Sequence, residues 1–120
     1  MRAGILIIGS LLWDNSQRDT WRRSRLFVDQ KLHVKAPICY GRRSRTRGNT
    51  FTMTFATSDV LGRAVLVPCK SAIESVEDIV GEAKALWRAE QPTAAPNSIG
   101  ASWGSVGILF GKTVPAEWLV

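Results

Sequence analysis

The sequence predicts an α+β fold, in which a β-sheet carries one main helix and one short helix. Strand-like segments follow one another along most of the chain, and one long amphipathic segment comes late. The 120 residues are enough for one hydrophobic core, and no internal repeat or low-complexity stretch divides them. We therefore expect a single domain that spans residues 1–120.

The first half of the chain is expected to form two strands and the short helix. Residues 3–8 are an apolar run of strand length that stops at a glycine-serine turn. Asn15 and Ser16 can cap a short helix directly after it. Residues 26–40 alternate apolar and polar side chains, which favours a strand. An arginine-rich stretch then ends in a turn signal at residues 48–49.

The second half is expected to add a strand pair, the long helix and a last strand. Residues 51–55 alternate strictly, which is typical of a half-buried strand, and residues 62–69 follow as its antiparallel partner. Apolar side chains at helical spacing predict a helix that begins at Ser71 and is stopped by Pro92. A final strand is expected over residues 105–110.

Composition excludes several classes of function. Cys39 and Cys69 lie in strand-like segments without metal-ligand spacing, so we expect reduced thiols and no metal site. His33 is the one histidine, and its alternation with apolar neighbours favours a solvent-facing position. No phosphate-binding glycine motif is present, so no cofactor is predicted. Without a signal peptide or an apolar run of membrane length, a cytoplasmic location is expected.

Positive charge is concentrated in two clusters of arginines. The net charge is +6, and the acidic residues gather instead in the stretch 74–82. A basic region attracts anions such as nucleic acid, phosphorylated metabolites or acidic small molecules. Few aromatic residues lie between the arginines, so the stacking part of a single-strand binding pattern is thin. The clusters consist of Arg22, Arg23 and Arg25, and of Arg42, Arg43, Arg45 and Arg47.

The turn after the first strand is the first candidate site. A buried strand that stops at glycine leaves the following N–H groups without ladder partners, and glycine allows a ligand to come close. The amides of Gly9, Ser10, Leu11 and Leu12 could therefore hold an anionic or carbonyl oxygen. An ordinary tight turn has the same pattern, so both interpretations stay open here.

Several segments, in order along the chain, resemble the γ-glutamylcyclotransferase-like superfamily, and most closely its ChaC-like, glutathione-specific branch. They are GSLLWD at residues 9–14, YGRRSRTRGN at 40–49, GRAV at 62–65 and ALWRAE at 85–90. The resemblance implies a small mixed, barrel-like sheet with helices packed around it. It also implies an activity that closes a γ-glutamyl group on itself and releases 5-oxoproline.

The resemblance assigns roles to particular residues. Glu90 would be the general acid and base, and Glu82, eight residues earlier, is the second candidate for that role. The turn amides would hold the glutamyl carboxylate or the developing oxyanion. Arg42 or Arg47 would recognise a second carboxylate through a two-pronged hydrogen bond. Glu90 could equally be a solvated glutamate in the last helical turn.

Two other functions remain open from the sequence. Ile8 stands where the family has a tyrosine, which favours a non-catalytic domain that binds a small acidic molecule or a protein. The arginine clusters leave nucleic-acid binding as the other alternative. A homodimer is implied only by the family resemblance.

Overall fold

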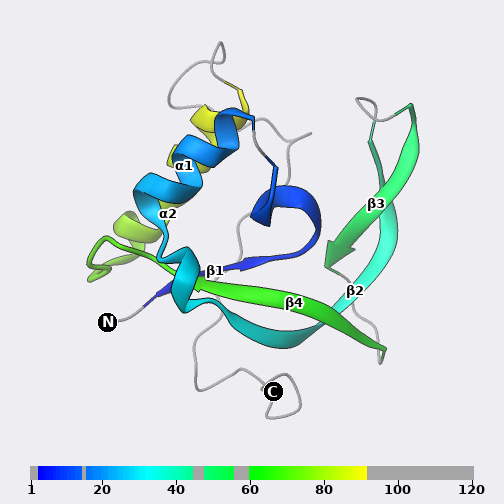
Figure 1. The fold of residues 1–120 in the computed structure, drawn as a ribbon, viewed down its shortest axis with the longest axis horizontal. Helices are drawn as coiled ribbons and strands as arrows, with labels where there is room; N and C mark the ends of the chain where they lie inside the picture. Colours follow the sequence, from blue (N-terminus) through cyan, green and yellow to red (C-terminus); the bar gives the residue numbers. More distant parts are fainter. Residues whose placement is uncertain (1–2, 15, 45–47, 56–59, 92–120) are drawn as a thin grey trace.

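The chain folds into a curled, four-stranded sheet with two α-helices packed on it, as the computed structural model shows (Figure 1). The structure describes residues 3–14, 16–44, 48–55 and 60–91. The strand order is β1-β4-β2-β3, and each pairing between described strands is antiparallel. The α+β class is thus confirmed, and the sheet has the shape of half a barrel.

One α-helix lies between the first two strands, three strands then follow one another directly, and the second α-helix comes after them. In order, the elements are β1 (Gly4–Ile7), η1 (Gly9–Leu12), α1 (Gln17–Arg25), η2 (Val28–Gln30), β2 (Leu32–Ser44), β3 (Thr50–Phe55), β4 (Leu61–Pro68) and α2 (Val76–Glu90). The strand expected over 105–110 lies outside the described residues.

Successive parts of the long strand β2 pair with two different strands. Its residues 32–37 pair with β4, and its residues 38–44 pair with β3. The predicted pairing of residues 51–55 with residues 62–69 is therefore wrong. β4 has apolar side chains on both faces and takes the central position between β1 and β2, which leaves β3 at the edge.

The β2–β3 ribbon differs from the sequence prediction in length and burial. β2 continues through residue 44, beyond the strand expected over 26–40. The turn signal is confirmed, because Gly48 and Asn49 both have positive φ angles, 65° and 60°. The strand predicted over 51–55 is confirmed as β3, but the prediction that its apolar face is buried is wrong, since Phe51 and Phe55 are both exposed. Among the described strands β3 pairs only with β2, and none of the described helices is in substantial contact with it.

Both helices begin at serine caps. Ser16 caps α1, as predicted. α2 begins later than Ser71, because Ser75 and Asp78 form a reciprocal capping box that fixes the first turn at Val76. Ile73 is buried in the preceding loop and not on the helix, although its spacing fits the helical pattern.

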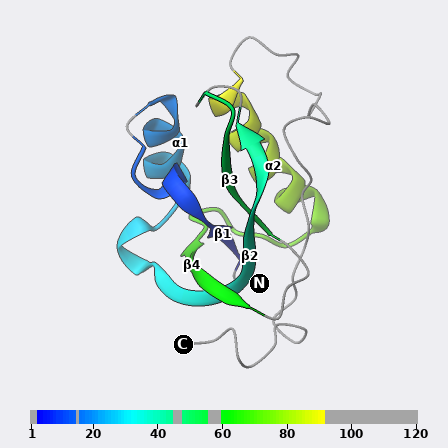
Figure 2. The same cartoon turned by 90° about the vertical axis from the view of Figure 1, so that its right-hand side faces the viewer.

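One face of the sheet carries the core. Ile7 on β1 and Val67 on β4 pack with Trp21 of α1 and Leu26, and partly buried side chains of α2 join them. α1 and α2 contact each other on this face. Figure 2, turned by 90°, shows the β2–β3 ribbon crossing the view between the two helices. The helices cover only part of the face, which leaves the curled end of the sheet open to a hollow described next.

Candidate functional site

A small hollow lies beside the turn that follows β1, and we call it the turn hollow. Its volume is about 200 Å³. Most of its described lining is apolar, with one histidine and one arginine, and none of the described lining residues is a carboxylate. The lining residues are Ile7, Gly9, Leu12, Trp13, His33, Met53, Arg63, Ala64 and Val65.

The sheet register explains why cationic side chains meet there. Ile7 pairs with Val65, and Val65 pairs with His33, so these three side chains form one row across three strands on the same face. Arg63 and Lys35 form the next row of that face. Arg63 and Lys35 are both exposed, and so is His33, which confirms its predicted solvent-facing position. The hollow thus has an apolar floor and a cationic side chain, Arg63, in its lining.

The turn itself is a 3₁₀ helix, and its geometry depends on glycine. Gly9 has a φ of 80°, in the left-handed region that favours glycine. In a 3₁₀ helix each N–H bonds to the carbonyl three residues earlier, so amides beyond the first turn point into the helix. The Ser10 carbonyl accepts hydrogen bonds from the amides of Trp13 and Asp14. The turn is therefore a closed structure, and only its first amides could face a ligand.

Arg22 fastens this turn from α1. Its guanidinium is buried and donates to the Leu11 carbonyl at 2.7 Å and to the Asp14 carbonyl at 3.0 Å. It also pairs with Asp19 at 2.7 Å. A basic side chain of the first arginine cluster thus has a structural role in supporting the wall of the hollow, whereas the sequence had suggested a role in attracting anions.

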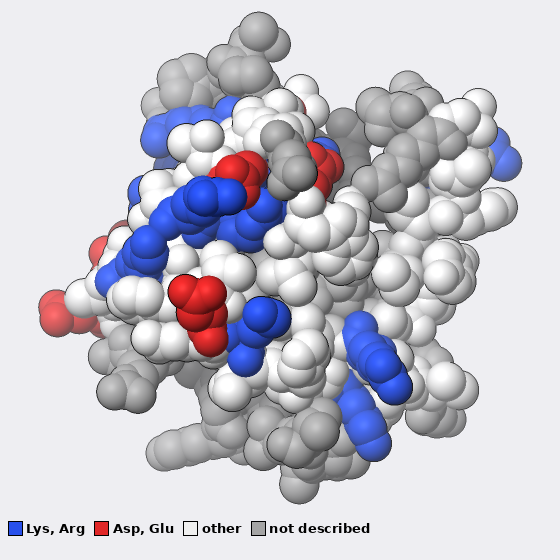
Figure 3. Space-filling model, viewed as in Figure 1, with Lys and Arg blue, Asp and Glu red and all other residues white. Residues whose placement is uncertain are grey.

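The other arginines of α1 also face carboxylates. Arg23 pairs with Asp19 at 2.9 Å and lowers the pKa of that carboxyl below its ordinary value. Arg25 pairs with Glu82, and Arg18 pairs with Asp14. In Figure 3, acidic and basic side chains lie together over the helical half of the molecule. The first arginine cluster is therefore largely neutralised within the fold.

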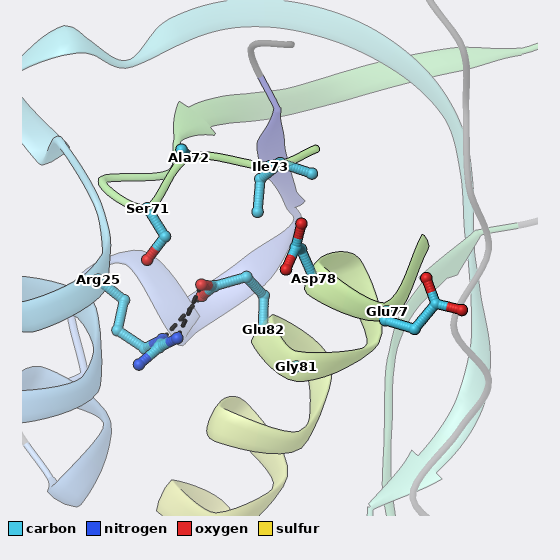
Figure 4. A pocket seen from close by; sticks show the side chains of 8 residues that line it. All are labelled: Arg25, Ser71, Ala72, Ile73, Glu77, Asp78, Gly81 and Glu82. Carbon is cyan, nitrogen blue, oxygen red and sulfur yellow. Dashed lines mark hydrogen bonds and ion pairs between the residues drawn. The ribbon is translucent and has the colours of Figure 1, made fainter. Parts of the chain in front are cut away.

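Glu82, the second candidate for the acid and base, belongs to a buried ion pair. Both its oxygens accept hydrogen bonds from Arg25, each at 2.7 Å (Figure 4). The side chain of Glu82 is only 7 % exposed, against 36 % for Arg25. This contact raises the pKa of Arg25. Glu82 thus joins α2 to α1, and both of its oxygens are occupied.

A second cavity, of about 250 Å³, borders this ion pair at the start of α2. Glu77, Asp78 and Glu82 all line it, and Figure 4 shows Glu77 directed away from Arg25. Asp78 accepts hydrogen bonds from the backbone amides of Glu74 and Ser75, which lower its pKa. The acidic lining of this second cavity disfavours an anionic ligand, so the turn hollow is the better site for a small acid.

Glu90 ends α2 and is linked to the turn through Arg18. Its Oε1 lies 3.0 Å from Arg18 Nε, and the same guanidinium pairs with Asp14 at 2.6 Å. Hydrogen bonds from the Ser16 side chain and backbone amide, helped by Arg18, lower the pKa of Asp14 to about 2. The segment directly after η1 and the end of α2 are thus joined through Arg18, although Glu90 does not line the turn hollow.

Only two of the four predicted turn residues line the turn hollow. Gly9 and Leu12 line the hollow, whereas Leu11 packs against the core, and the Ser10 carbonyl closes the turn. Arg42 lies in β2, paired with Thr52 of β3. Arg47 lies outside the described residues.

Sequence reasoning did not find the roles of Arg63 and Met53 in the hollow, and it treated His33 only as a surface residue. These residues lie in strand segments whose pairing was predicted incorrectly, so their proximity could not be inferred. In the part of the chain that the structure describes, no group of His, Cys, Asp and Glu is arranged to hold a metal ion. No helix there combines the length and apolar character needed to cross a bilayer.

Comparison with family models, with curated proteins and with solved structures gives no match for this chain.

Proposed function

We propose that the chain binds a small carboxylate-bearing molecule in the turn hollow. The observation that carries this proposal is the combination of an apolar floor with Arg63 and His33 in the lining, Lys35 paired with Arg63 in the sheet, and no acidic residue among the described residues of the lining. Anions are attracted to such cationic side chains, and a low-dielectric floor strengthens the interaction. The resemblance to γ-glutamylcyclotransferase-like proteins makes γ-glutamyl compounds the class to test first.

The dimensions of the hollow favour a small ligand. Its volume of about 200 Å³ is below the lower end, about 300 Å³, of the range for drug-sized ligands. A molecule the size of an amino acid fits that space better than a nucleotide. We propose that the Arg63 guanidinium holds the carboxylate through two parallel hydrogen bonds, and that Val65 and Met53 contact the aliphatic part.

Arg63→Ala tests this proposal. Isothermal titration of glutarate is expected to give an affinity about 10- to 100-fold lower for the variant, because a charge-assisted hydrogen bond is worth roughly 1.5–3 kcal/mol. Arg88, an exposed arginine near the end of α2, provides the matched control. Arg88→Ala should bind glutarate as the wild type does.

A neutral analogue separates charge from shape. Glutaramide has the same carbon skeleton without the carboxylates, and we expect it to bind far more weakly than glutarate. Equal binding of the two compounds, or equal losses in Arg63→Ala and Arg88→Ala, would contradict the proposed site. Backbone amide shifts of Gly9 and Val65 on titration locate the ligand independently of affinity.

Cyclotransferase activity is a second candidate, favoured by the link from Glu90 through Arg18 to Asp14. In that reaction the α-amino nitrogen of the substrate attacks the γ-carbonyl carbon, the new C–N bond closes the ring, and the bond to the leaving amine breaks. Glu90 would take the proton from the attacking nitrogen and return it to the leaving amine. Such a role requires Arg18 to release one carboxylate oxygen when substrate is present.

Release of 5-oxoproline from γ-glutamyl amino acids measures this activity. Glu90→Gln is expected to lower kcat by about 100-fold or more, the usual contribution of a general acid or base. Glu77→Gln, which changes an exposed carboxylate on the same helix, is the matched control and should keep full activity. Product formation that is equal in both variants would remove Glu90 from the chemistry. Glutarate binding without product would leave the ligand-binding proposal standing alone.

A further inference from the structure

We propose that the β2–β3 ribbon binds single-stranded nucleic acid on one face, which we call the ribbon face. The face is defined by Tyr40 and Arg43 on β2 and by Phe51 and Phe55 on β3. This inference does not depend on a small ligand, although Met53, between Phe51 and Phe55 on the same side of β3, also lines the turn hollow. It rests on the register between β2 and β3, on the solvent exposure of the aromatic side chains and on the charge around them.

The register places these side chains on one surface. Phe51 and Phe55 have the same parity along β3 and therefore point the same way. The register shift between Tyr40 and Arg42 brings Arg43 opposite Phe51, while Tyr40 remains opposite Met53. The shift thus places Arg43, where an unshifted register would place Arg42, opposite Phe51. The Arg43 guanidinium lies 5.7 Å from the centre of the Phe51 ring.

The aromatic side chains of the ribbon face are open to solvent. Tyr40 is 73 % exposed, Phe51 60 % and Phe55 47 %. Figure 1 shows the ribbon rising away from the two helices, so its face is not used for packing against them. The two phenylalanines are ~13 Å apart along the strand, far enough for separate bases to stack on each ring. Aromatic platforms of this kind bind bases with little sequence preference.

The charge around the ribbon face fits a polyanion. Residues 30–58 contain six lysines and arginines and no aspartate or glutamate. In Figure 3 no acidic side chain is visible over the β2–β3 side of this face. This distinguishes the ribbon from α1, where each described arginine pairs with a carboxylate. The sequence pattern had suggested that few aromatics accompany the arginines, but pairing with β3 brings Phe51 beside them.

A second copy of the chain is a weaker occupant for the same surface. Two ribbons packed face to face would bring like charges together, because Arg43 of each copy lies on this face. A phosphate backbone has the opposite charge, and its bases supply flat apolar surfaces. Stacking and charge neutralisation therefore act together only for a nucleic acid.

Fluorescence anisotropy with a labelled oligothymidylate of roughly 12 nucleotides tests the proposal. Tyr40→Ala and Phe51→Ala are each expected to weaken binding by about tenfold through lost stacking. Arg43→Ala is expected to weaken binding and to reduce the slope of log affinity against log salt by about 0.7, the value for one phosphate contact on a single strand. These side chains are exposed, so the variants should fold normally, which circular dichroism checks.

The fold supplies matched controls. Phe27 is an exposed phenylalanine with Lys70 5.8 Å from its ring, and it lies outside the ribbon. Arg23 is an exposed arginine on α1. Phe27→Ala and Arg23→Ala should bind the oligonucleotide within about twofold of the wild type, since neither removes a stacking platform of the ribbon face.

Three results would overturn the proposal. The first is no change in anisotropy for the wild type at roughly 50 mM salt, where non-specific binding is favoured. The second is an equal loss in the control and ribbon variants, which would indicate diffuse charge attraction alone. The third is a wild-type dimer in sedimentation that Tyr40→Ala converts to a monomer without any binding of oligonucleotide. A tenfold loss confined to the ribbon variants supports it.

Discussion

Replacing Arg22 by methionine is expected to lower the free energy of unfolding by about 3 kcal/mol. The substitution removes the donors for the carbonyls of Leu11 and Asp14, and each buried acceptor left unpaired costs roughly 1–3 kcal/mol. Methionine keeps much of the side-chain volume, so the loss reports hydrogen bonding and not a cavity. Urea unfolding followed by tryptophan fluorescence measures the change.

The adjacent arginine provides the control. Arg23 pairs with the same carboxylate, Asp19, but its side chain is exposed and reaches no backbone carbonyl through a described bond. Arg23→Met should therefore change stability by less than about 0.5 kcal/mol. Equal losses in Arg22→Met and Arg23→Met would show that Arg22 contributes only a surface ion pair.

The second large effect is expected at the ion pair between the helices. Arg25→Met leaves the buried Glu82 carboxylate without its donors and should destabilise the fold by about 3–5 kcal/mol. Glu82→Gln is expected to cost less, because Arg25 is more exposed and can turn towards water. Thermal unfolding of the two variants at neutral pH tests this asymmetry.

A double variant separates a buried unpaired charge from lost packing. Arg25→Met combined with Glu82→Leu removes both charges, and hydrophobic replacement of a buried ion pair is often neutral. The double variant should recover most of the stability that Arg25→Met loses. Failure to recover would mean that the hydrogen bonds themselves, and not the desolvated carboxylate, hold α1 and α2 together.

Local features of the fold could be predicted from the sequence. Ser16 and the positive-φ pair Gly48 and Asn49 depend on neighbouring backbone groups, so short patterns are sufficient to locate them. The start of α2 was missed because Ser71 and Ser75 both suit a cap. Ser71 is followed three residues later by Glu74, as Ser75 is by Asp78, so the local pattern fits both, and the capping box forms at Ser75.

Features that depend on pairing between distant strands could not be predicted in this way. The sequence places residues 51–55 next to 62–69, and the shortest connection favours that pairing. Burial decides otherwise, because β4 is apolar on both faces and excludes an edge position. The turn hollow follows from this register, since it places Arg63 one row from His33.

Only the local part of the candidate site could be predicted from the sequence, because its other residues are brought together by strand pairing. The glycine turn is a local pattern, and Gly9 and Leu12 do line a hollow. The interpretation of the arginines as an anion-attracting surface fails for Arg22, which is buried. A guanidinium that binds backbone carbonyls leaves no periodic trace in a sequence, so charge clusters alone cannot separate structural arginines from ligand-binding ones.

The pairing of Gly4 with Pro68 sets the order in which the sheet can assemble. Closing a chain loop becomes entropically more expensive as it lengthens, so contacts between near neighbours form before contacts between remote ones. β2 and β3 are adjacent in the sequence and can pair early, whereas β1 can pair only after β4 has formed. The opening segment of the chain, although made first, is therefore expected to dock last, and with it the wall of the turn hollow.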